Sequence, residues 1–469
     1  MSPAIATAAY ALGILGLFFL DFDPDSRPSK ALWMPVLWLF IEASRPVSSW
    51  LQMAPPTSAG TYLDGSPLDR AVFLSLSIAG LLVLVARHRQ IWMLLPTNRA
   101  VLFFFVYCGA SVFWSDYGDV AFRRWIKALG ELVMVLIVLT EPHPITALKR
   151  LLSRAGFLLL PLSVLFIKYY GDLGRNYRPG DFGTLWNTMI IGVTTDKNAL
   201  GMIAMIFGLG ALWQLLSLHE LKDAPRRSRR LAAQSALLVI ALWVLWLSNS
   251  MTSLLCFLLG STLLVFTKRW AFFRRPAVLV TIVIAALGLS LFGAFIAPNL
   301  LSVLGRDPTL TGRTEIWNLV LSMTSNPLLG TGFESFWLGS RLQQMWSIYW
   351  WHPNEAHNGY IEIFLELGWV GITLLALLLL TGLRKVVIAV RQQEEAGRLM
   401  LAYFLAVLVY NLTESAFRAL NPIWFVLLLS VIAVPESCLI GETDQIDEIA
   451  ESEAELPDLV STDPLKSAI

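Results

Sequence analysis

Two residues suited to phosphate chemistry share one long polar stretch of the chain, residues 310–371. Arg313 stands near its start, and His357 follows near its end, two residues after Glu355. Arginine binds phosphate oxygens through two parallel hydrogen bonds, and histidine accepts a proton near neutral pH. We therefore predict that Arg313 binds a phosphate group and that His357 is a general base, with Glu355 and Asn358 as substrate-binding neighbours. A histidine at the mouth of a helix can also be a simple helix cap, and this alternative stays open.

The same polar stretch is rich in aromatic side chains and leads into an apolar helix that carries carboxylates. Aromatic residues favour the interface between membrane and water, and their faces also stack on sugar rings, so two interpretations remain. Glu362 and Glu366 lie within the apolar helix, where ionisable residues are costly and usually functional. The aromatic residues are Phe333, Phe336, Trp337, Trp346, Tyr349, Trp350 and Trp351.

A second group of cations lies elsewhere in the sequence, near helix ends. Arg123, Arg124 and Lys127 open one apolar helix, and Arg178 lies in the loop 171–197. If these helix ends face outward, the cations oppose the usual excess of Lys and Arg in cytoplasmic loops. Either the number of spans differs by one, or they snorkel to lipid headgroups, or they bind an anionic substrate; we name them as candidate substrate-binding residues. The outer loops contain no Asp-x-Asp element, so we expect no required metal ion.

These residues must be positioned by helices that cross a membrane. Of the 469 residues, 56% are hydrophobic and 15% are charged, whereas a soluble domain is about 25% charged. Apolar runs recur along the chain at roughly the 20-residue length that a spanning helix needs. Strands of a membrane barrel would be apolar only at every second position, so we predict an all-α, polytopic integral membrane protein. The expected spans lie near residues 4–20, 31–43, 70–86, 99–114, 124–140, 155–170, 198–218, 232–248, 251–267, 277–297, 358–381, 399–416 and 420–434.

The second of these spans is short enough to be re-entrant, so we expect about 12–13 transmembrane helices. The distribution of Lys and Arg then sets the orientation, because basic loops stay in the cytoplasm. This places the segment 298–357 outside as one long catalytic loop and the C-terminus inside. We divide the chain into a multi-span membrane domain, 1–435, and an acidic tail, 436–469, which we expect to be disordered. The three strongest basic segments are 222–230, 268–275 and 384–398.

Short motifs of glycine, arginine and aromatic residues are spaced along these spans. The pair His357-Asn358 is followed by nine residues and then by Gly368 and Gly371. The other motif residues are Ser44-Arg45-Pro46-Val47-Ser48 with Trp50, Trp114-Ser115, Asp196-Lys197-Asn198 with Gly201, Thr311-Gly312-Arg313 with Trp317, and Pro327 with Gly330-Thr331-Gly332-Phe333. In this order, they resemble the bacterial O-antigen ligase and polysaccharide polymerase superfamily, and most closely its exopolysaccharide-polymerisation branch. The resemblance adds Lys197 to the candidate substrate-binding residues.

The resemblance implies a glycosyltransferase of surface or exopolysaccharide biosynthesis in the bacterial inner membrane. Its donor would be a glycan on undecaprenyl diphosphate at the periplasmic face, and its acceptor would be a lipid or a glycan. Arg313 would then hold the diphosphate, no cofactor is expected, and other polysaccharide-assembly proteins are further expected partners. The sequence does not distinguish a polymerase from a ligase.

Two departures from the family pattern are present. Asp196 stands where the exopolysaccharide branch has a histidine, and Met251 follows Ser250 where an arginine is common. The missing cation transfers the expected diphosphate contact to Arg313, Arg178 or the group that begins at Arg123. A polysaccharide flippase is the alternative from another class, and it would need broken helices and charges near the midplane of the membrane. A partner-binding membrane protein is the third possibility.

Overall fold

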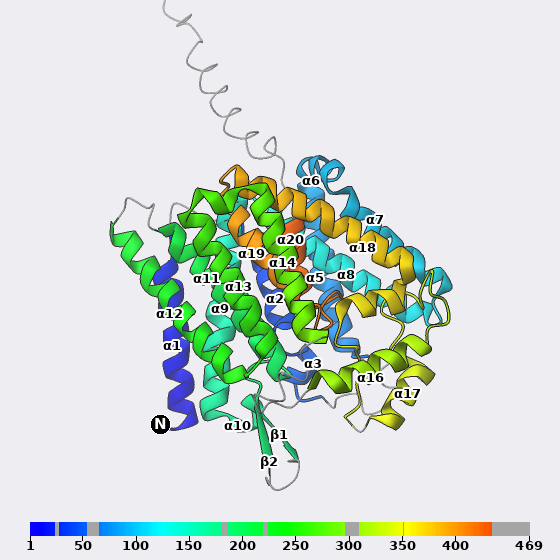
Figure 1. Ribbon diagram of the computed structural model, residues 1–469. Coiled ribbons are helices and arrows are strands. Elements are labelled where there is room, and N and C mark those ends of the chain that lie inside the picture. Colours follow the sequence, from blue (N-terminus) through cyan, green and yellow to red (C-terminus); the bar gives the residue numbers. More distant parts are fainter. Residues whose placement is uncertain are drawn as a thin grey trace, which may run out of the picture.

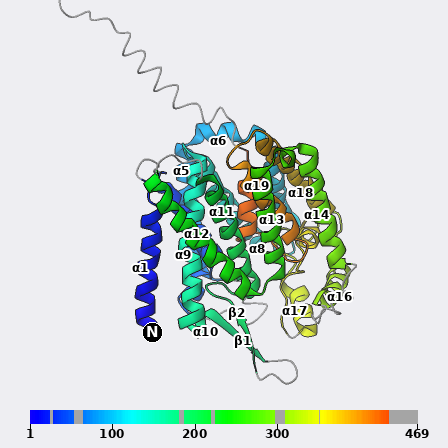
Figure 2. The ribbon, with the colours of Figure 1, turned by 60° about the vertical axis from the view of Figure 1, so that its left-hand side comes forward.

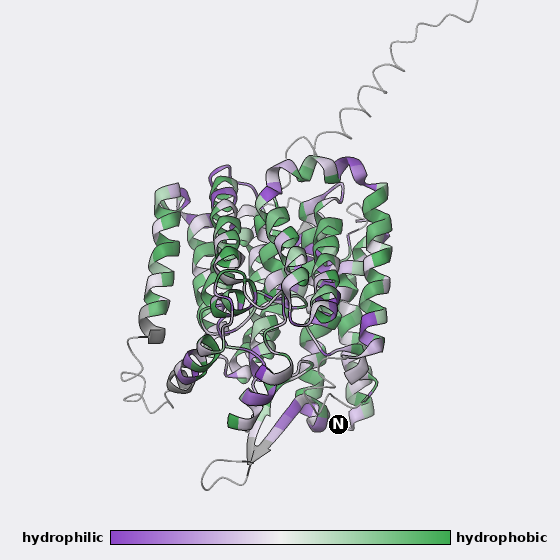
Figure 3. Cartoon of the chain, turned by 90° about the vertical axis from the view of Figure 1, so that its right-hand side faces the viewer, coloured by the Kyte–Doolittle hydropathy of each residue, from purple (hydrophilic) through white to green (hydrophobic). Residues whose placement is uncertain are grey.

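The computed structural model is a bundle of long helices with shorter elements at its two ends (Figure 1). It describes residues 1–23, 28–53, 65–179, 186–218, 224–295, 309–349 and 351–433. The predicted acidic tail, 436–469, and residues 298–308 of the predicted catalytic loop lie outside these ranges. Apolar residues cover the middle of the helices, and hydrophilic residues gather toward the two ends of the bundle (Figure 3).

Within the described ranges, eight helical stretches are long and apolar enough to cross a membrane. They are α1 (Pro3–Asp21), α5 (Pro67–Ala86), α7 (Arg99–Ala110) with its flanking 3-10 turns, α9 (Pro144–Tyr169), α11 (Lys197–Leu218), α12 (Ala224–Ser248), α13 (Met251–Arg269) and α18 (Gly359–Arg391). The shorter apolar helices are α14 (Pro276–Phe295), α19 (Gly397–Tyr410) and α20 (Pro422–Val431).

The two remaining predicted spans also coincide with helices. The short α2 (Trp33–Glu42) has ten residues, and α8 (Gly118–Leu139) carries several charged residues near its start. Each of the predicted apolar segments therefore lies on a helix, although fewer than 12 of them have the length and composition of a complete span. The all-α, polytopic membrane fold is confirmed.

The other elements are short and connect the long helices. Within the predicted loop 171–197, β1 (Arg175–Pro179) and β2 (Trp186–Ile190) form an antiparallel hairpin. The short helices are α3 (Val47–Trp50), α6 (His88–Leu94), α10 (Gly171–Gly174), α16 (Thr309–Ser322) and α17 (Gly339–Ile348). The 3-10 turns are η1 (Lys30–Leu32), η2 (Pro96–Asn98), η3 (Ser111–Trp114) and η4 (Ala271–Arg274).

Helices α11 and α20 form the centre of the bundle. Every residue of α20 is buried, and α11 packs against α9, α12, α13 and α19. A helix that is apolar on all sides is stable only where neighbours or lipid cover it. By contrast, α1 is mostly exposed and lies at the edge of the bundle against α9 and α12 (Figure 2).

The two ends of the bundle differ in character. The hairpin, α16 and α17 lie at one end, and α6 lies at the other (Figure 1). The connection from α18 to α19, with its basic residues, is at the α6 end, because Glu395 bonds there to Lys149 of α9 and Trp213 of α11. Buried ion pairs fix this end, including Arg150–Asp21 and Arg87–Glu141, each at 2.6 Å. The described basic residues of 222–230, 268–275 and 384–398 thus lie at the end of the bundle away from the predicted catalytic loop. This agrees with the prediction that all three segments share one side of the membrane.

Candidate functional site

Four segments that are distant in the sequence meet at the end of the bundle that carries α16. They are the start of α11, α16, the loop 351–358 before α18, and the turn 411–421 between α19 and α20. The turn links them through hydrogen bonds, of which one joins the Asn198 amide of α11 to the Glu414 carboxylate at 3.0 Å. The site is therefore assembled by helix packing rather than by one continuous loop.

Glu414 lies at the centre of this meeting point and is 7% exposed. Its Oε1 accepts hydrogen bonds from the Arg313 guanidinium at 3.2 Å and from the Asn198 amide at 3.0 Å. Its Oε2 lies 3.4 Å from Nδ1 of His357. Arg313 also donates to the carbonyl of Thr413. The two predicted catalytic residues are thus brought together by one buried carboxylate.

A second carboxylate, Glu355, faces His357 from the other side. Its Oε1 lies 2.9 Å from Nδ1 of His357, and its Oε2 lies 3.0 Å from the Arg418 guanidinium. Both carboxylates approach Nδ1, so Nε2 is the ring nitrogen that remains to exchange a proton with a substrate. The Trp351 ring stacks on the imidazole at a centroid distance of 5.9 Å. We call Arg313, Glu355, His357, Glu414 and Arg418 the Glu414 cluster.

The charges of the Glu414 cluster shift the pKa of two of its members. Burial alone would raise the pKa of Glu355, but the Arg418 charge and the hydrogen bond to His357 outweigh it and hold the pKa at about 2. Burial alone would lower the pKa of His357, but its two carboxylate partners raise it to about 10. The ring is therefore an imidazolium at neutral pH. It can serve as the predicted general base only after it loses this proton.

The residues of the Glu414 cluster also offer a possible set of metal ligands. Ligand atoms of Glu355, His357 and Glu414 lie within 4.8 Å of one another. However, Arg313 and Arg418 already pair with these two carboxylates, so a divalent cation would have to approach two guanidinium groups. The positive charges of the metal ion and of the guanidinium groups would repel each other strongly in a partly buried site. With two guanidinium groups and an imidazolium, the Glu414 cluster suits an anion better than a metal ion.

Asn358, one of the predicted substrate-binding residues, has a structural role at the start of α18. It is 5% exposed and is the N-cap of α18. Its Oδ1 accepts from the N–H groups of Tyr360 and Ile361, and its Nδ2 donates to the carbonyl of Leu412. These bonds occupy the amide, so it fixes the start of α18 beside His357. They also show that the cap of this helix is Asn358 and not His357.

The two predicted glycine motifs interlock next to the site. Helix α18 is interrupted at Gly368, where φ is 62° and ψ is −163°. The segment 327–332 fills the break, and the Thr331 N–H donates to the freed carbonyl of Leu365 at 3.1 Å. A Cβ at Gly368 would lie 2.3 Å from the carbonyl oxygen of Leu328, so glycine is required here. The interlock fixes the short first half of α18, which carries two buried carboxylates.

The predicted aromatic patch is mostly a hydrophobic core rather than a surface. Phe333, Phe336 and Trp337 are buried, and the latter two pack under α16. Among the described members of the patch, Trp351 is the one that contacts the Glu414 cluster. This packing holds the outer segment on the bundle, so most of these rings cannot stack on a ligand. Trp350 lies outside the described residues.

Two of the predicted outer cations line a cavity beside the Glu414 cluster. The cavity has a volume of about 410 Å³, and Arg124 and Lys127 of α8 face it together with Arg418 and Glu362. We call it the Glu334 cavity, after the residue opposite α8. Arg123 does not line it. Two of the three α8 cations thus line a cavity, and their substrate-binding role stays a prediction.

The structure gives less information about the last two predicted cations, Lys197 and Arg178. Lys197 begins α11, and its neighbour Asn198 is the residue of that motif that bonds to Glu414. Arg178 lies on β1 opposite Asn187, and its side chain is outside the described part of the chain. Neither residue has a described contact with the Glu414 cluster. Their substrate-binding roles remain predictions.

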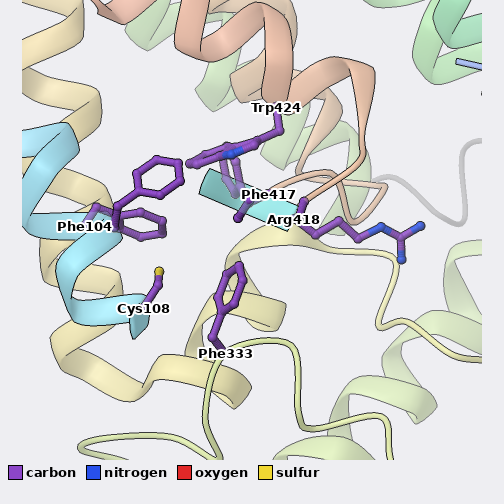
Figure 4. A pocket seen from close by; sticks show the side chains of 9 residues that line it. Phe104, Cys108, Phe333, Phe417, Arg418 and Trp424 are labelled. Atoms are coloured by element: carbon purple, nitrogen blue, oxygen red, sulfur yellow. The ribbon is translucent and has the colours of Figure 1, made fainter. Parts of the chain in front are cut away.

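A small apolar pocket of about 10 Å³ adjoins the Glu334 cavity. Figure 4 shows that Phe104, Phe333, Phe417 and Trp424 surround it. Arg418 reaches past these rings with its guanidinium pointing away from them (Figure 4). The aromatic side chains thus support the arginine stem while its charge remains available to Glu355.

Three residues of the site were missed by the sequence interpretation: Glu414, Arg418 and Asn198. Glu414 and Arg418 lie in the turn 411–421; Glu414 fell within the predicted span 399–416, and Arg418 fell between it and the predicted span 420–434. The polar run Asn411-Leu412-Thr413-Glu414-Ser415 was the available signal, because such residues are costly within an apolar helix.

Comparisons with known proteins agree with the motifs. Residues 236–376, which include Arg313 and His357, match the family model described as O-Antigen ligase. The exopolysaccharide production protein ExoQ of Rhizobium meliloti is 27% identical over 296 residues, covering 60% of this chain and 63% of that protein. Putative polysaccharide ligases of Rickettsia felis and Rickettsia prowazekii are 25% and 24% identical. These matches cover 43% of this chain and 52% of each ligase, so the chain spans about half to two thirds of these relatives. The resemblance predicted from the sequence is confirmed.

Proposed function

We propose that this chain, which resembles the O-antigen ligase and polysaccharide polymerase superfamily, is a glycosyltransferase that uses a lipid diphosphate-linked glycan as its donor. The donor lipid would be undecaprenyl diphosphate, and the reaction would take place at the periplasmic face of the inner membrane. The observation that carries the proposal is the Glu414 cluster. It places two guanidinium groups and an imidazolium around two carboxylates, opposite the basic end of the bundle.

The proposed reaction forms one glycosidic bond and breaks one bond to diphosphate. An acceptor hydroxyl attacks the anomeric carbon of the donor, and the bond from this carbon to the diphosphate oxygen breaks with its electron pair on the leaving group. Arg313 and Arg418 stabilise the charge that develops there. Guanidinium groups suit this task because they bind phosphate oxygens bidentately and keep their charge.

The proton of the acceptor hydroxyl passes to Nε2 of His357 in this proposal. Glu355 holds Nδ1 at 2.9 Å, which orients the ring and stabilises the imidazolium that forms. The ring must first lose the proton that it carries in the resting site, because its pKa is about 10. His357 thus remains the candidate base, with a pH dependence set by its carboxylate partners.

A lipid-linked glycan transporter is the second candidate, because α18 is a broken helix and such helices are frequent in transporters. In this chain the break is filled by protein: the segment 327–332 bonds to it, and Gly368 packs against Leu328. The charged groups of the Glu414 cluster also lie near one end of the bundle, the end that carries α16. Both features favour chemistry at the membrane surface over passage through the bundle.

The test reconstitutes purified protein in vesicles with a lipid-linked repeat unit as donor and follows new glycosidic bonds. We expect transfer by the wild type. We expect a loss of about 30- to 1,000-fold for Arg313→Ala, with incomplete rescue by Arg313→Lys because lysine lacks the bidentate fork. Arg341→Lys is the matched control, since Arg341 lies in the same outer segment but pairs with Asp116. Movement of the donor across the membrane without bond formation would identify a transporter instead.

A polymerase and a ligase differ in the glycan that a deletion strain produces. Loss of long chains with normal attachment of single units would indicate a polymerase. Long chains that remain on the carrier lipid would indicate a ligase. Normal glycans with unchanged attachment would argue against both.

A further inference from the structure

The Glu334 cavity has no role in the reaction proposed above, although it shares a wall with the Glu414 cluster. Arg418 lines the cavity and pairs with Glu355 at 3.0 Å. Ser415 also lines it, accepts from the Asn358 N–H at 3.0 Å and donates to Glu362 at 3.3 Å. A group bound in the cavity would therefore lie next to the proposed reaction centre.

The formal charges of the two sites differ. In the Glu414 cluster the cationic groups outnumber the carboxylates, which suits a diphosphate. In the cavity three carboxylates balance three cations once the shared Arg418 is counted, so it has no excess of positive charge for a second diphosphate. Besides the shared Arg418, the ionisable residues that line the cavity are Arg124, Lys127, Glu334, Glu362 and Glu366.

Several polar groups of the cavity have capacity to bind a neutral ligand. Oε1 of Glu334 accepts from the Ala419 N–H at 2.8 Å, which leaves Oε2 for another donor. Lys127 has no hydrogen bond or ion pair within the described ranges. Carboxylates accept hydrogen bonds from hydroxyl groups, and an ammonium donates to them. Trp337 also lines the cavity, and its Nε1–H donates to Glu362 at 2.8 Å.

We propose that the Glu334 cavity binds the acceptor: a sugar residue whose free hydroxyl attacks the donor. This inference rests on the proposed function, and it assigns the acceptor, the second substrate of the reaction, to the Glu334 cavity. The volume of about 410 Å³ falls within the range of about 300–1,000 Å³ that is usual for small-molecule sites. Glu334 and Lys127 bind the sugar hydroxyls, and the hydroxyl nearest to Arg418 faces the Glu414 cluster.

The experiment separates the two substrates. The donor is the lipid-linked repeat unit of the source organism, and the acceptor probe is an oligosaccharide released from the same polymer by partial acid hydrolysis. We expect Lys127→Gln and Glu334→Gln to raise the KM for the acceptor about 10- to 100-fold each, because each removes a charged partner of a hydroxyl. The Kd for the donor should stay within about twofold. Lys127→Gln removes no described hydrogen bond, so it tests the site even if Glu334→Gln fails to fold.

Each alternative outcome has a definite meaning. An unchanged acceptor KM in Lys127→Gln with normal donor binding would overturn the inference. A weaker donor Kd with an unchanged acceptor KM would assign the cavity to the donor instead. The proposed function fails separately, if the wild type forms no glycosidic bond. In that case, direct binding of the acceptor oligosaccharide, measured by ligand-detected NMR in wild type and Lys127→Gln, still decides whether the cavity holds a sugar.

Discussion

The pH dependence of glycosyl transfer gives a sharp test of the proposed base. The two carboxylates on Nδ1 raise the pKa of His357 from its ordinary 6.5 to about 10. At pH 7, the neutral ring is then about one thousandth of the population. If neutral His357 takes the proton of the acceptor hydroxyl, the rate must rise about tenfold for each pH unit between pH 7 and 9.

Glu355→Gln perturbs this dependence without removing the ring. Loss of the carboxylate that lies 2.9 Å from Nδ1 lowers the pKa of His357, since this partner favours the charged form. The rising limb should therefore move to lower pH by at least about one unit. Asp116→Asn is the control, because Asp116 is an exposed carboxylate that pairs with Arg341 outside the site.

The measurement uses purified protein with saturating lipid-linked donor and follows glycosidic bonds between pH 6 and 9.5. A flat profile over this range would refute the base role and indicate that the imidazolium itself stabilises the leaving diphosphate. The same conclusion would follow if Glu355→Gln left the profile of the wild type unchanged. Donor binding measured over the same range separates an effect on chemistry from an effect on affinity.

Three further predictions concern the base, the interlock and the orientation. His357→Asn should keep the fold, since asparagine tolerates the φ of 52° at this position, but should lose about 100- to 10,000-fold in transfer rate at high pH; a normal rate would exclude the histidine. Gly368→Ala should lower the free energy of unfolding in detergent by about 2–5 kcal/mol, whereas Gly16→Ala, which faces open space, should not; equal thermal stability would contradict the interlock. A cysteine at Arg341 should react with an impermeant maleimide in intact spheroplasts and one at Gln393 only after lysis; the reverse pattern would put the proposed site in the cytoplasm.

The membrane fold could be predicted because its main signal is local in the chain. A run of apolar residues long enough to cross hydrocarbon is recognisable without its neighbours, so α11 was expected at 198–218 and is found at Lys197–Leu218. The glycine motifs around Gly332 and Gly368 were also visible. Their structural role could not be read from the sequence, because it consists of backbone contacts between two segments that are distant in the chain.

The sequence by itself thus determined that the chain is a polytopic helical membrane protein, and it predicted Arg313 and His357 as the residues of one site. Only the tertiary structure decided that both residues bind Glu414 and that α8 faces a cavity beside them. The physical reason is that hydropathy acts on each helix separately, whereas the site depends on which helix ends pack together. Hydropathy alone could not show that the turn 411–421 supplies a buried carboxylate. A few polar residues at the end of an apolar run change the predicted length of the span, but they do not indicate which helices pack beside it.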